Sequence, residues 1–184
     1  MGAVALAVGL LPHPATVGAD VGTDATAAAR QYVQIRNRDS VCCIEVANSA
    51  VETGSRIQMS TCRGQSGSMW ELRRPPGHTG SLPWIYNPGS NRCVSLRGVE
   101  SGTPSAGTAL QLEPCEWRGA DDGAGDDSVW RFVSGGPNRE NILSGLRLSD
   151  GSFPCVEYDG DHQLRLARCG SNPRQDWVRV RIRL

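Results

Sequence analysis

The sequence predicts an all-β domain made of three similar units related by pseudo-threefold symmetry. Three observations support this fold class: the composition, a cysteine-bearing strand pattern that occurs three times, and a tryptophan that closes each unit. The 184 residues include 22 glycines and 11 prolines but only 2 phenylalanines, which favours many short elements separated by turns. A chain of this length can bury a sizeable core in one domain. We therefore expect one globular domain and exclude a helical bundle.

The N-terminal segment carries an apolar run over residues 3–11 that is too short to span a bilayer, followed by small residues up to Ala19. This arrangement is typical of a secretory signal and its cleavage site, although no positive charge precedes the run. The alternative is a disordered leader. In both cases we expect residues 1–30 to lie outside the fold and residues 31–184 to form a single domain. No other stretch is long enough to cross a membrane.

Each unit is expected to contain four short strands with alternating faces. The expected first strands are 32–35, 84–86 and 146–148. The second strands share the pattern cysteine, β-branched, polar, apolar and lie at 43–46, 93–96 and 155–158. The third strands end on a cysteine and lie at 57–62, 110–115 and 164–169. The fourth strands each carry a tryptophan flanked by apolar residues, at Trp70, Trp130 and Trp177.

The units run over about 32–72, 83–133 and 142–182, and the turn-forming linkers 73–77 and 135–137 join them. The spacing from the second cysteine to the tryptophan is 8, 15 and 8 residues, and the surplus in the middle unit falls in an Asp/Gly-rich stretch typical of a surface loop. One four-stranded unit cannot bury its apolar face alone. The three units must therefore close on one another.

Seven cysteines occur without a Cys-x-x-Cys pair or a Cys/His cluster of zinc spacing, which favours disulfides and an oxidising, extracellular location. The pairing follows from the symmetry of the repeat: Cys43–Cys62, Cys93–Cys115 and Cys155–Cys169. Cys42 is left over, because adjacent strand residues point to opposite faces and only one of them can reach Cys62. We expect its thiol near solvent, where it is either inert or paired to another chain.

With these repeats in place, residues 32–184 resemble a ricin B-type lectin domain, which is a β-trefoil. The family closes each repeat with Gln-x-Trp; Gln175 and Trp177 match this motif fully, whereas Trp70 and Trp130 keep only the tryptophan. The resemblance implies that the three tryptophans pack in a shared core. It also implies a secreted, non-catalytic, carbohydrate-binding domain with glycan or glycoprotein partners and no cofactor or metal.

In that family each unit can hold a shallow sugar site made of a carboxylate, a stacking aromatic residue and an amide. The carboxylate positions here are Glu45, Ser95 and Glu157. The stacking positions, two before the second cysteine, are Ser60, Glu113 and Ala167. The amide positions, three before the tryptophan, are Gly67, Asp127 and Arg174. No unit keeps a full galactose-type site, so we expect degenerate sites.

Unit three is the first candidate, with Glu157 as an exposed acceptor, Gln175 as an amide, and Tyr158 or His162 as a replacement for the stacking ring. The alternative for Tyr158 is that it fills the apolar fourth position of its strand.

Two further candidates lie outside unit three. Unit one keeps Glu45 and Gln58. Unit two has lost the carboxylate but carries Trp117 beside its acidic insertion, either as a contact surface or as the buried anchor of a loop.

The balance of 19 basic and 19 acidic residues provides no field for nucleic acid or an anionic membrane. The acidic stretch 121–127 lacks EF-hand spacing and is better explained as a solvated loop than as a calcium site. Arg179, Arg181 and Arg183 alternate with three apolar residues along the last strand. We expect the arginines to face outward, as a solvated face or as a docking surface for an anionic glycan or acidic partner.

The function classes can be ranked on these observations. Catalysis is not expected, because His78 and His162 lie in a linker and a turn and no nucleophile or metal motif accompanies them. The leading hypothesis is a carbohydrate-binding trefoil. The second is a protein-interaction or receptor-binding subunit that has lost sugar binding, as in the ricin-like subunits of cytolethal distending toxins. A trefoil enzyme inhibitor is a third, without a reactive-loop signal. A glycan array separates the first two.

Overall fold

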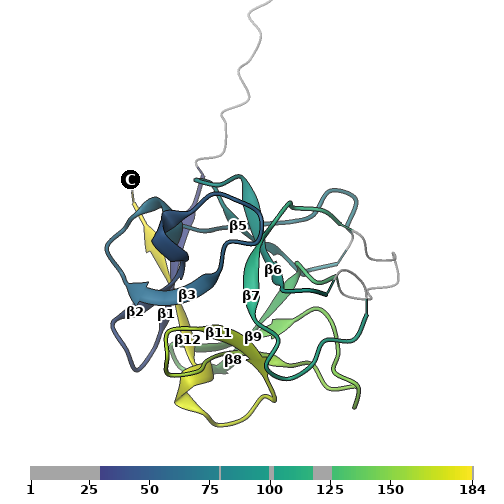
Figure 1. The fold of residues 1–184 in the computed structure, drawn as a ribbon. Helices are drawn as coiled ribbons and strands as arrows, with labels where there is room; N and C mark the ends of the chain where they lie inside the picture. Colours follow the sequence, from purple (N-terminus) through teal and green to yellow (C-terminus); the bar gives the residue numbers. More distant parts are fainter. Residues whose placement is uncertain (1–29, 79, 100–101, 118–125, 184) are drawn as a thin grey trace, which may run out of the picture.

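The computed structural model describes residues 30–78, 80–99, 102–117 and 126–183. The leader expected over residues 1–30 lies outside the described residues apart from Arg30, and so do residues 121–125 of the acidic stretch. The described residues form twelve strands and three short 3-10 helices. Figure 1 shows them arranged as three lobes around a common centre.

Each repeat contributes four strands, as the sequence predicts. The first repeat holds β1 (Tyr32–Asn37), β2 (Cys42–Val46), β3 (Ile57–Thr61) and β4 (Glu71–Arg73). The second holds β5 (Trp84–Asn87), β6 (Arg92–Leu96), β7 (Leu110–Glu113) and β8 (Trp130–Gly136). The third holds β9 (Arg139–Ser144), β10 (Cys155–Tyr158), β11 (Leu164–Ala167) and β12 (Trp177–Ile182). The 3-10 helices are η1 (Ala47–Ser49), η2 (Ser66–Ser68) and η3 (Pro173–Gln175).

The first strand of the third repeat is not where the sequence predicts it. The strand is β9, whereas residues 146–148 follow it and are not part of a strand. Residues 146–148 alternate correctly, but the Leu148 N–H donates to the Ser152 carbonyl and the Gly151 N–H donates back to Leu148, which makes a local turn. The predicted linker 135–137 is the end of β8 and the tight connection to β9, with Asn138 at a φ of 53°.

Six of the strands close into a barrel. The hairpin-like pairs are β4 with β5, β8 with β9, and β12 with β1. The remaining seams are a pairing of β9 with β12 and two isolated bridges, Val33 with Trp70 and Trp84 with Val129. A closed barrel leaves no long unpaired edge for another chain to join.

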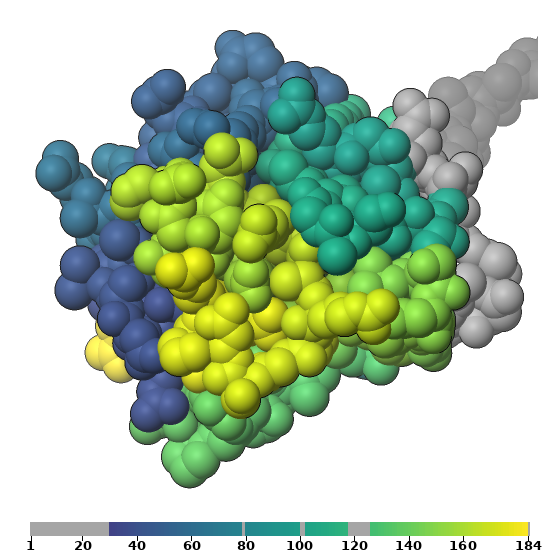
Figure 2. All heavy atoms as spheres, turned by 60° about the horizontal axis from the view of Figure 1, so that its bottom comes forward, coloured from purple at the N-terminus to yellow at the C-terminus, as the bar shows by residue number. Residues whose placement is uncertain are grey.

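The other six strands form three hairpins that cover one end of the barrel. They are joined in a ring by three equivalent backbone hydrogen bonds of 2.7 to 2.8 Å. These bonds run from Leu112 to Ser55, from Leu166 to Thr108 and from Met59 to His162. Figure 2 shows the three repeats meeting on one face, the first in purple and blue, the second in teal and the third in yellow-green and yellow. The architecture is a β-trefoil, as predicted.

The core contains the three repeat tryptophans. Trp70, Trp130 and Trp177 are fully buried, and each indole N–H donates a 3.0 Å hydrogen bond to a strand carbonyl. The acceptors are Ile44, Val94 and Val156, which are equivalent positions of β2, β6 and β10. A buried indole needs such a partner, because an unpaired N–H in the core would be costly. The tryptophans are therefore structural.

The three disulfides are those that the symmetry predicts: Cys43–Cys62, Cys93–Cys115 and Cys155–Cys169. Cys42 is not in a disulfide, and its half-buried side chain packs against the edge of the core. Each disulfide joins the second strand of a repeat to the loop that follows its third strand. That loop is thereby held over the outer face of the second strand.

Arg179 and Arg181 of the last strand are exposed, as expected, but they line the open end of the barrel. The expectation that the alternating apolar residues face the core is wrong. Ile35 is fully buried and pairs with Arg179, and directly paired residues of antiparallel strands share a face. Arg179 and Arg181 therefore continue the inward row that begins at Trp177, beyond the end of the core. The half-buried residues of the other face, all outside the core clusters, are Val178, Val180 and Ile182. Alternation alone does not tell which face is inside.

Candidate functional site

The three candidate positions lie on the outer face of the second strand of each repeat. In β2, Ile44 and Val46 point into the core, so Cys43 and Glu45 lie on the opposite face. Ser95 and Glu157 hold the same place in β6 and β10, and the pairing register is identical: Glu45 with Gln58, Ser95 with Gln111, and Glu157 with Arg165. The disulfide-tied loop covers this face, which explains why all three side chains are buried.

Glu157 is held by its own repeat. Its carboxylate accepts hydrogen bonds of 2.8 Å from the amides of Asn172 and Gln175, and Arg165 forms an ion pair with it at 3.2 Å. The residue is only 8% exposed, so the expectation of an exposed acceptor is wrong. The reason is the loop before Trp177, whose amides converge on the carboxylate. Charge-assisted bonds of this kind orient the group firmly.

Gln175 also holds the loop itself. Its amide N–H donates to the Arg168 carbonyl at 2.9 Å, and its amide oxygen accepts from the Gly170 N–H at 3.0 Å. The side chain is almost completely buried. Gln175 therefore connects the end of β11, the start of the loop and the Glu157 carboxylate.

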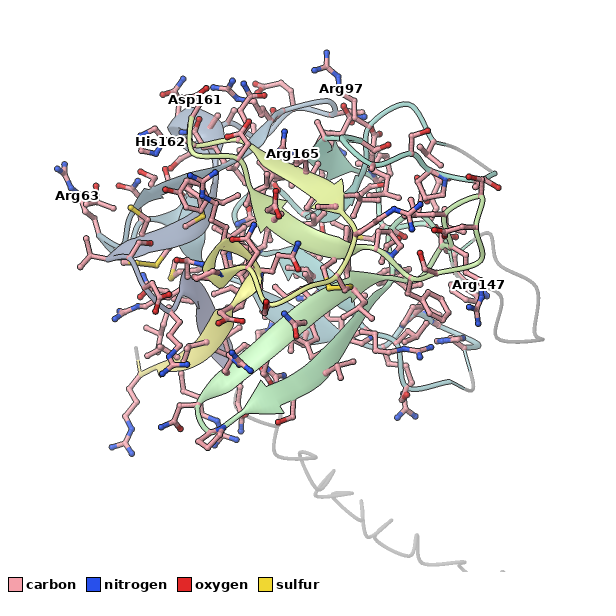
Figure 3. The ribbon with its side chains drawn as sticks, turned by 90° about the horizontal axis from the view of Figure 1, so that it is seen from below. Arg63, Arg97, Arg147, Asp161, His162 and Arg165 are labelled. Carbon is pink, nitrogen blue, oxygen red and sulfur yellow. A yellow bond between two sulfur atoms is a disulfide. The ribbon has the colours of Figure 1, made fainter. Side chains whose placement is uncertain are left out.

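Tyr158 and His162, the two candidate stacking rings, lie in different surroundings. Tyr158 is half-buried, packs against the core and pairs with Leu164, as Val46 pairs with Ile57 in the first repeat. The Arg174 guanidinium lies over its ring at 5.5 Å. His162 is exposed in the turn of the hairpin, with a φ of 64°, and Figure 3 shows it beside Asp161.

In the first repeat, Glu45 is 2% exposed and its Oε1 accepts a 2.7 Å hydrogen bond from Gln65. Its other oxygen has no partner among the described residues. Gln58 pairs with Glu45 in the strand register, but its side-chain oxygen accepts from Arg56 at 3.1 Å. Glu45 and Gln58 are therefore neighbours that do not hydrogen-bond through their side chains.

Gln65 and Asn172 donate hydrogen bonds to the candidate carboxylates of the first and third repeats, and neither is expected from the sequence. Each lies three residues after the second cysteine of its repeat, Cys62 or Cys169, and each donates to the glutamate of that repeat. The sequence does contain a signal for these two amides, because both lie at the same distance after the second cysteine. Their equivalence is not visible when positions are numbered back from the tryptophan.

In the second repeat the carboxylate comes from the segment before Trp130 and not from the second strand. The Ser95 hydroxyl donates a 2.7 Å hydrogen bond to Asp127 Oδ2, so a carboxylate contacts the residue that holds the strand position of the glutamates. Beside this pair lies a hollow of about 150 Å³. The polar side chains that line it are Ser95, Gln111, Glu113, Glu116, Asp127 and Ser128. In the sequence, Asp127 holds the amide position of its repeat, where a carboxylate departs from the family pattern.

Trp117, which precedes the acidic stretch in the sequence, is half-buried. Its ring lies 4.2 Å from the ring of His78, tilted by 37°, and it packs against a second apolar cluster. The buried members of that cluster are Leu82, Trp84, Tyr86, Cys93 and Val129. This packing agrees with the second interpretation of Trp117, a buried aromatic anchor, and not with an exposed contact surface.

The described part of the chain contains no group of three or more His, Cys, Asp or Glu side chains that could hold a metal ion. Among the same residues, no helix has the length and apolar character needed to cross a membrane.

The comparisons with known proteins agree with this architecture. The family profile of the ricin-type beta-trefoil lectin domain matches residues 31–177. Curated protein sequences show no significant match. Among solved structures, the designed threefold-symmetric protein ThreeFoil superposes with a TM-score of 0.66 at 15% identity, covering 81% of this chain and 97% of ThreeFoil.

Two natural proteins superpose similarly. The ricin B-like lectin of Macrolepiota procera, solved with lactose, has a TM-score of 0.58 at 15% identity, covering 81% of this chain and 94% of the lectin. An exo-β-1,3-galactanase from Clostridium thermocellum has a TM-score of 0.65 at 18% identity, covering 85% of this chain but only 31% of the enzyme. At these identities the likenesses show the fold alone.

Proposed function

Because the chain belongs to the ricin-type β-trefoil lectin family, we propose that it binds carbohydrate and that the second repeat holds the working site. The observation that carries this proposal is the hollow beside Ser95 and Asp127. Its volume of about 150 Å³ is below the roughly 300–1,000 Å³ of pockets that enclose drug-sized ligands. A hollow of this size suits one ring of a glycan lying against the surface.

The lining of the hollow suits a ligand rich in hydroxyl groups. Glu113 accepts a hydrogen bond from Gln111, and an ionised carboxylate offers about four acceptor positions, so it can also accept from sugar hydroxyls. Asp127 is oriented by Ser95. Charge-assisted hydrogen bonds to hydroxyls are among the stronger polar contacts. Val99 adds a small apolar contact at the edge of the hollow.

Glu45 and Glu157 support the further proposal that the sites of the first and third repeats are degenerate. Both carboxylates already accept hydrogen bonds from amides of their own repeats and are almost fully buried. A sugar at Glu157 would have to compete with the amides of Asn172 and Gln175, and at the buried Glu45 only one oxygen is left to accept a hydrogen bond. The candidate site in the third repeat, with Glu157, Tyr158, His162 and Gln175, stays a prediction that the experiment below also tests.

We further propose that the domain is secreted and acts by binding alone. Three disulfides persist best in an oxidising compartment, which supports secretion. His78 stacks on Trp117 in the second repeat and His162 lies in a hairpin turn of the third, so the two histidines do not share a site. That separation supports binding without catalysis.

A second candidate function is a protein-interaction domain that has lost sugar binding. The observation that favours it is the internal pairing of Glu45 and Glu157, together with Ser60, Glu113 and Ala167 at the stacking positions. A domain of this kind would keep the trefoil for shape alone.

A glycan array followed by titration tests the proposal. Lactose is the first probe, because the Macrolepiota procera lectin was solved with it. We expect Asp127→Asn to weaken binding about tenfold or more, since a hydrogen bond to a charged group contributes about 1.5–3 kcal/mol. Asp39→Asn, at an exposed turn of the first repeat, is the matched control and should leave affinity unchanged.

The other outcomes decide between the alternatives. Binding that survives Asp127→Asn but falls in a folded Glu157→Gln or Glu45→Gln variant would place the working site in the third or the first repeat. A folded chain that binds no glycan on the array would overturn the proposal in favour of the protein-interaction function.

A further inference from the structure

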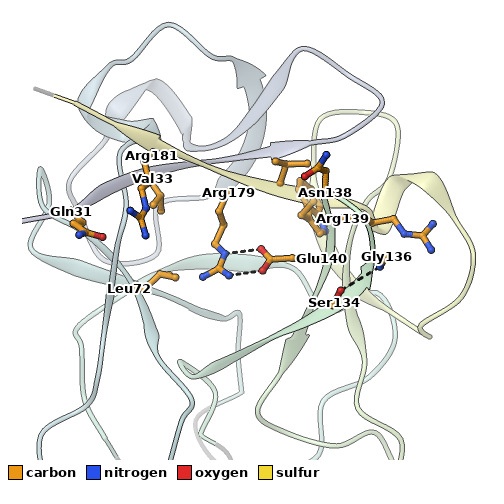
Figure 4. A pocket seen from close by; sticks show the side chains of 12 residues that line it. Gln31, Val33, Leu72, Ser134, Gly136, Asn138, Arg139, Glu140, Arg179 and Arg181 are labelled. Carbon is orange, nitrogen blue, oxygen red and sulfur yellow. Dashed lines mark hydrogen bonds and ion pairs between the residues drawn. The ribbon is translucent and has the colours of Figure 1, made fainter.

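The open end of the barrel, opposite the three hairpins, contains a cavity of about 510 Å³. Its walls come from β1, β4, β8, β9 and β12, and Figure 4 shows it from close by. The volume lies within the roughly 300–1,000 Å³ typical of ligand pockets. None of the residues discussed for the three sugar positions lines it.

Arginines reach this cavity because β12 runs past the end of the core. Trp177 closes the core, and Arg179 and Arg181 follow it on the same face at steps of about 6.6 Å. Arg181 pairs with Val33 and Arg179 with Ile35. The inward row therefore changes from apolar to cationic where the barrel opens.

The arginines differ in how they are held. Arg179 forms a two-point ion pair with Glu140, through Nε at 2.6 Å and through Nη2, and its guanidinium lies 4.5 Å from the centroid of the Phe132 ring. Arg139 forms an ion pair with Asp176 at 3.3 Å. Arg181 forms no ion pair with another described residue. Its guanidinium is thus the one whose charge a ligand can neutralise.

The remaining lining is a mixture of small polar and apolar groups. Gln31, Ser134 and Asn138 can each donate and accept hydrogen bonds. Val33 and Leu72 offer an apolar wall that also packs against the core. The lining has three arginines against one carboxylate, Glu140, so the cavity carries a net positive charge.

We propose that this cavity binds an acidic saccharide unit, with a carboxylate or sulfate group facing Arg181. The sugar hydroxyls would meet Gln31, Ser134 and Asn138, and an apolar sugar face would lie on Val33 and Leu72. This goes beyond the lactose-type site of the second repeat, because the position, the charge and the ligand class all differ. The two sites share no lining residue.

The geometry favours a sugar ring over an acidic peptide. An extended peptide binds best along a groove or at an unpaired strand edge. Here the ligand would enter an open cavity whose walls are strands that already pair with one another. A compact ring with one charged substituent fits that shape better than a chain does.

Matched sugars test the charge requirement. Galacturonic acid and galactose differ at C6, which is a carboxylate in one and a hydroxymethyl group in the other; galactose 6-sulfate represents the sulfate source. Titration of the full chain is followed by backbone amide chemical shifts at low ionic strength. We expect saturable shifts of Val33, Leu72 and Asn138 with the acidic sugars, weakened by added salt, and none at these residues with galactose.

Two variants test the residue assignment. Arg181→Gln should weaken binding of the acidic sugar about tenfold. Arg183→Gln, the next arginine along the same strand and outside the cavity lining, should change it less than twofold, a weak surface effect. Neutral-glycan binding at the second repeat should be the same in both variants. Failure of one site is then distinguishable from failure of the other.

Several results would overturn the proposal. Equal affinity for galactose and galacturonic acid would show that charge is not recognised. Unchanged binding in Arg181→Gln would place the ligand elsewhere. Acetate or inorganic sulfate binding as tightly as the sugars would indicate an anion site without sugar recognition. A tetraglutamate peptide that binds when galacturonic acid and galactose 6-sulfate do not would indicate an acidic protein partner.

Discussion

Ser95 and Asp127 form a 2.7 Å hydrogen bond that replaces, in the second repeat, the glutamate found in the first and the third. The carboxylate has moved from the strand to the loop before Trp130, while the buried hydroxyl remains on the strand. The three repeats therefore share the same strand pairing but differ in the position of the carboxylate side chain.

Removing the Ser95 hydroxyl tests this relationship. Ser95→Ala deletes the donor that orients Asp127, at a cost of about 1 kcal/mol in unfolding free energy. We expect lactose affinity to fall less than in Asp127→Asn, because the acceptor itself remains. Urea unfolding and lactose titration of both variants measure the two effects. An affinity loss in Ser95→Ala larger than in Asp127→Asn would contradict the assigned roles.

Glu157→Ala should destabilise the domain, because the Asn172 and Gln175 amides lose their shared acceptor. Buried donors left without a partner cost about 1–3 kcal/mol. Urea unfolding measures the change. Glu52→Ala, an exposed residue of the first repeat, is the control and should stay within about 0.5 kcal/mol of the wild type. Equal midpoints for the two variants would rule out the structural role of Glu157.

Reduction of the disulfides should unfold the domain or strongly destabilise it. The bridged cysteines are 19, 22 and 14 residues apart, and loops of this size correspond to roughly 3 kcal/mol each in the chain-entropy model. Thermal unfolding with and without reductant measures the loss. Non-reducing peptide mapping checks the pairing, and a bridge between two repeats would be inconsistent with the threefold arrangement.

Asp150 should show an unusually low pKa. Hydrogen bonds from the Ser152 hydroxyl and backbone N–H, together with Arg168, lower the pKa of Asp150 from 3.8 to about 2. A carboxyl whose pKa is lower in the folded state stabilises the fold above its unfolded pKa, and this contribution is lost as the pH falls from about 4 toward 2. Carboxyl carbon shifts followed against pH measure it. Ser152→Ala should raise the pKa, and a wild-type titration near 4 would refute the prediction.

Cys42 should be the one cysteine that an alkylating reagent modifies in the oxidised chain. Because it is half-buried at the edge of the core, we expect it to react more slowly in the folded protein than in denaturant. Intact mass after alkylation should show a monomer with a single adduct. A reducible covalent dimer would instead assign Cys42 to an intermolecular bond, and a monomer with no free thiol and no adduct would require another pairing.

Much of the fold could be predicted because its signals are local and repeated. The cysteine and tryptophan spacings locate the second, third and fourth strands, and symmetry then pairs the cysteines correctly. The first strand of the third repeat could not be located this way, because residues 146–148 alternate as well as β9 does and only the Leu148–Ser152 turn distinguishes them. The alternating pattern shows that Arg179 and Arg181 share a face, but it does not show which face is inside or where the barrel ends.

The candidate site was less predictable, because its chemistry depends on which side chains converge. Glu45 and Glu157 were found from their strand positions, but their burial follows from Gln65 and Asn172 reaching over them from the next loop. Asp127 was located correctly and its partner Ser95 was not foreseen. Hydrogen bonds between a strand and a loop 32 residues away leave no periodic trace in the sequence.

Because β1 pairs with β12, the first strand of the domain lacks one of its partners until the last strand has been synthesised. On a ribosome, Tyr32–Asn37 emerges early but has no neighbour on that side until Trp177–Ile182 has been synthesised. During this interval β1 is an open strand edge, and such edges recruit other chains. Contacts this distant in sequence also slow folding. A nascent chain that is truncated or stalled before β12 should therefore aggregate, even though its first two repeats are complete.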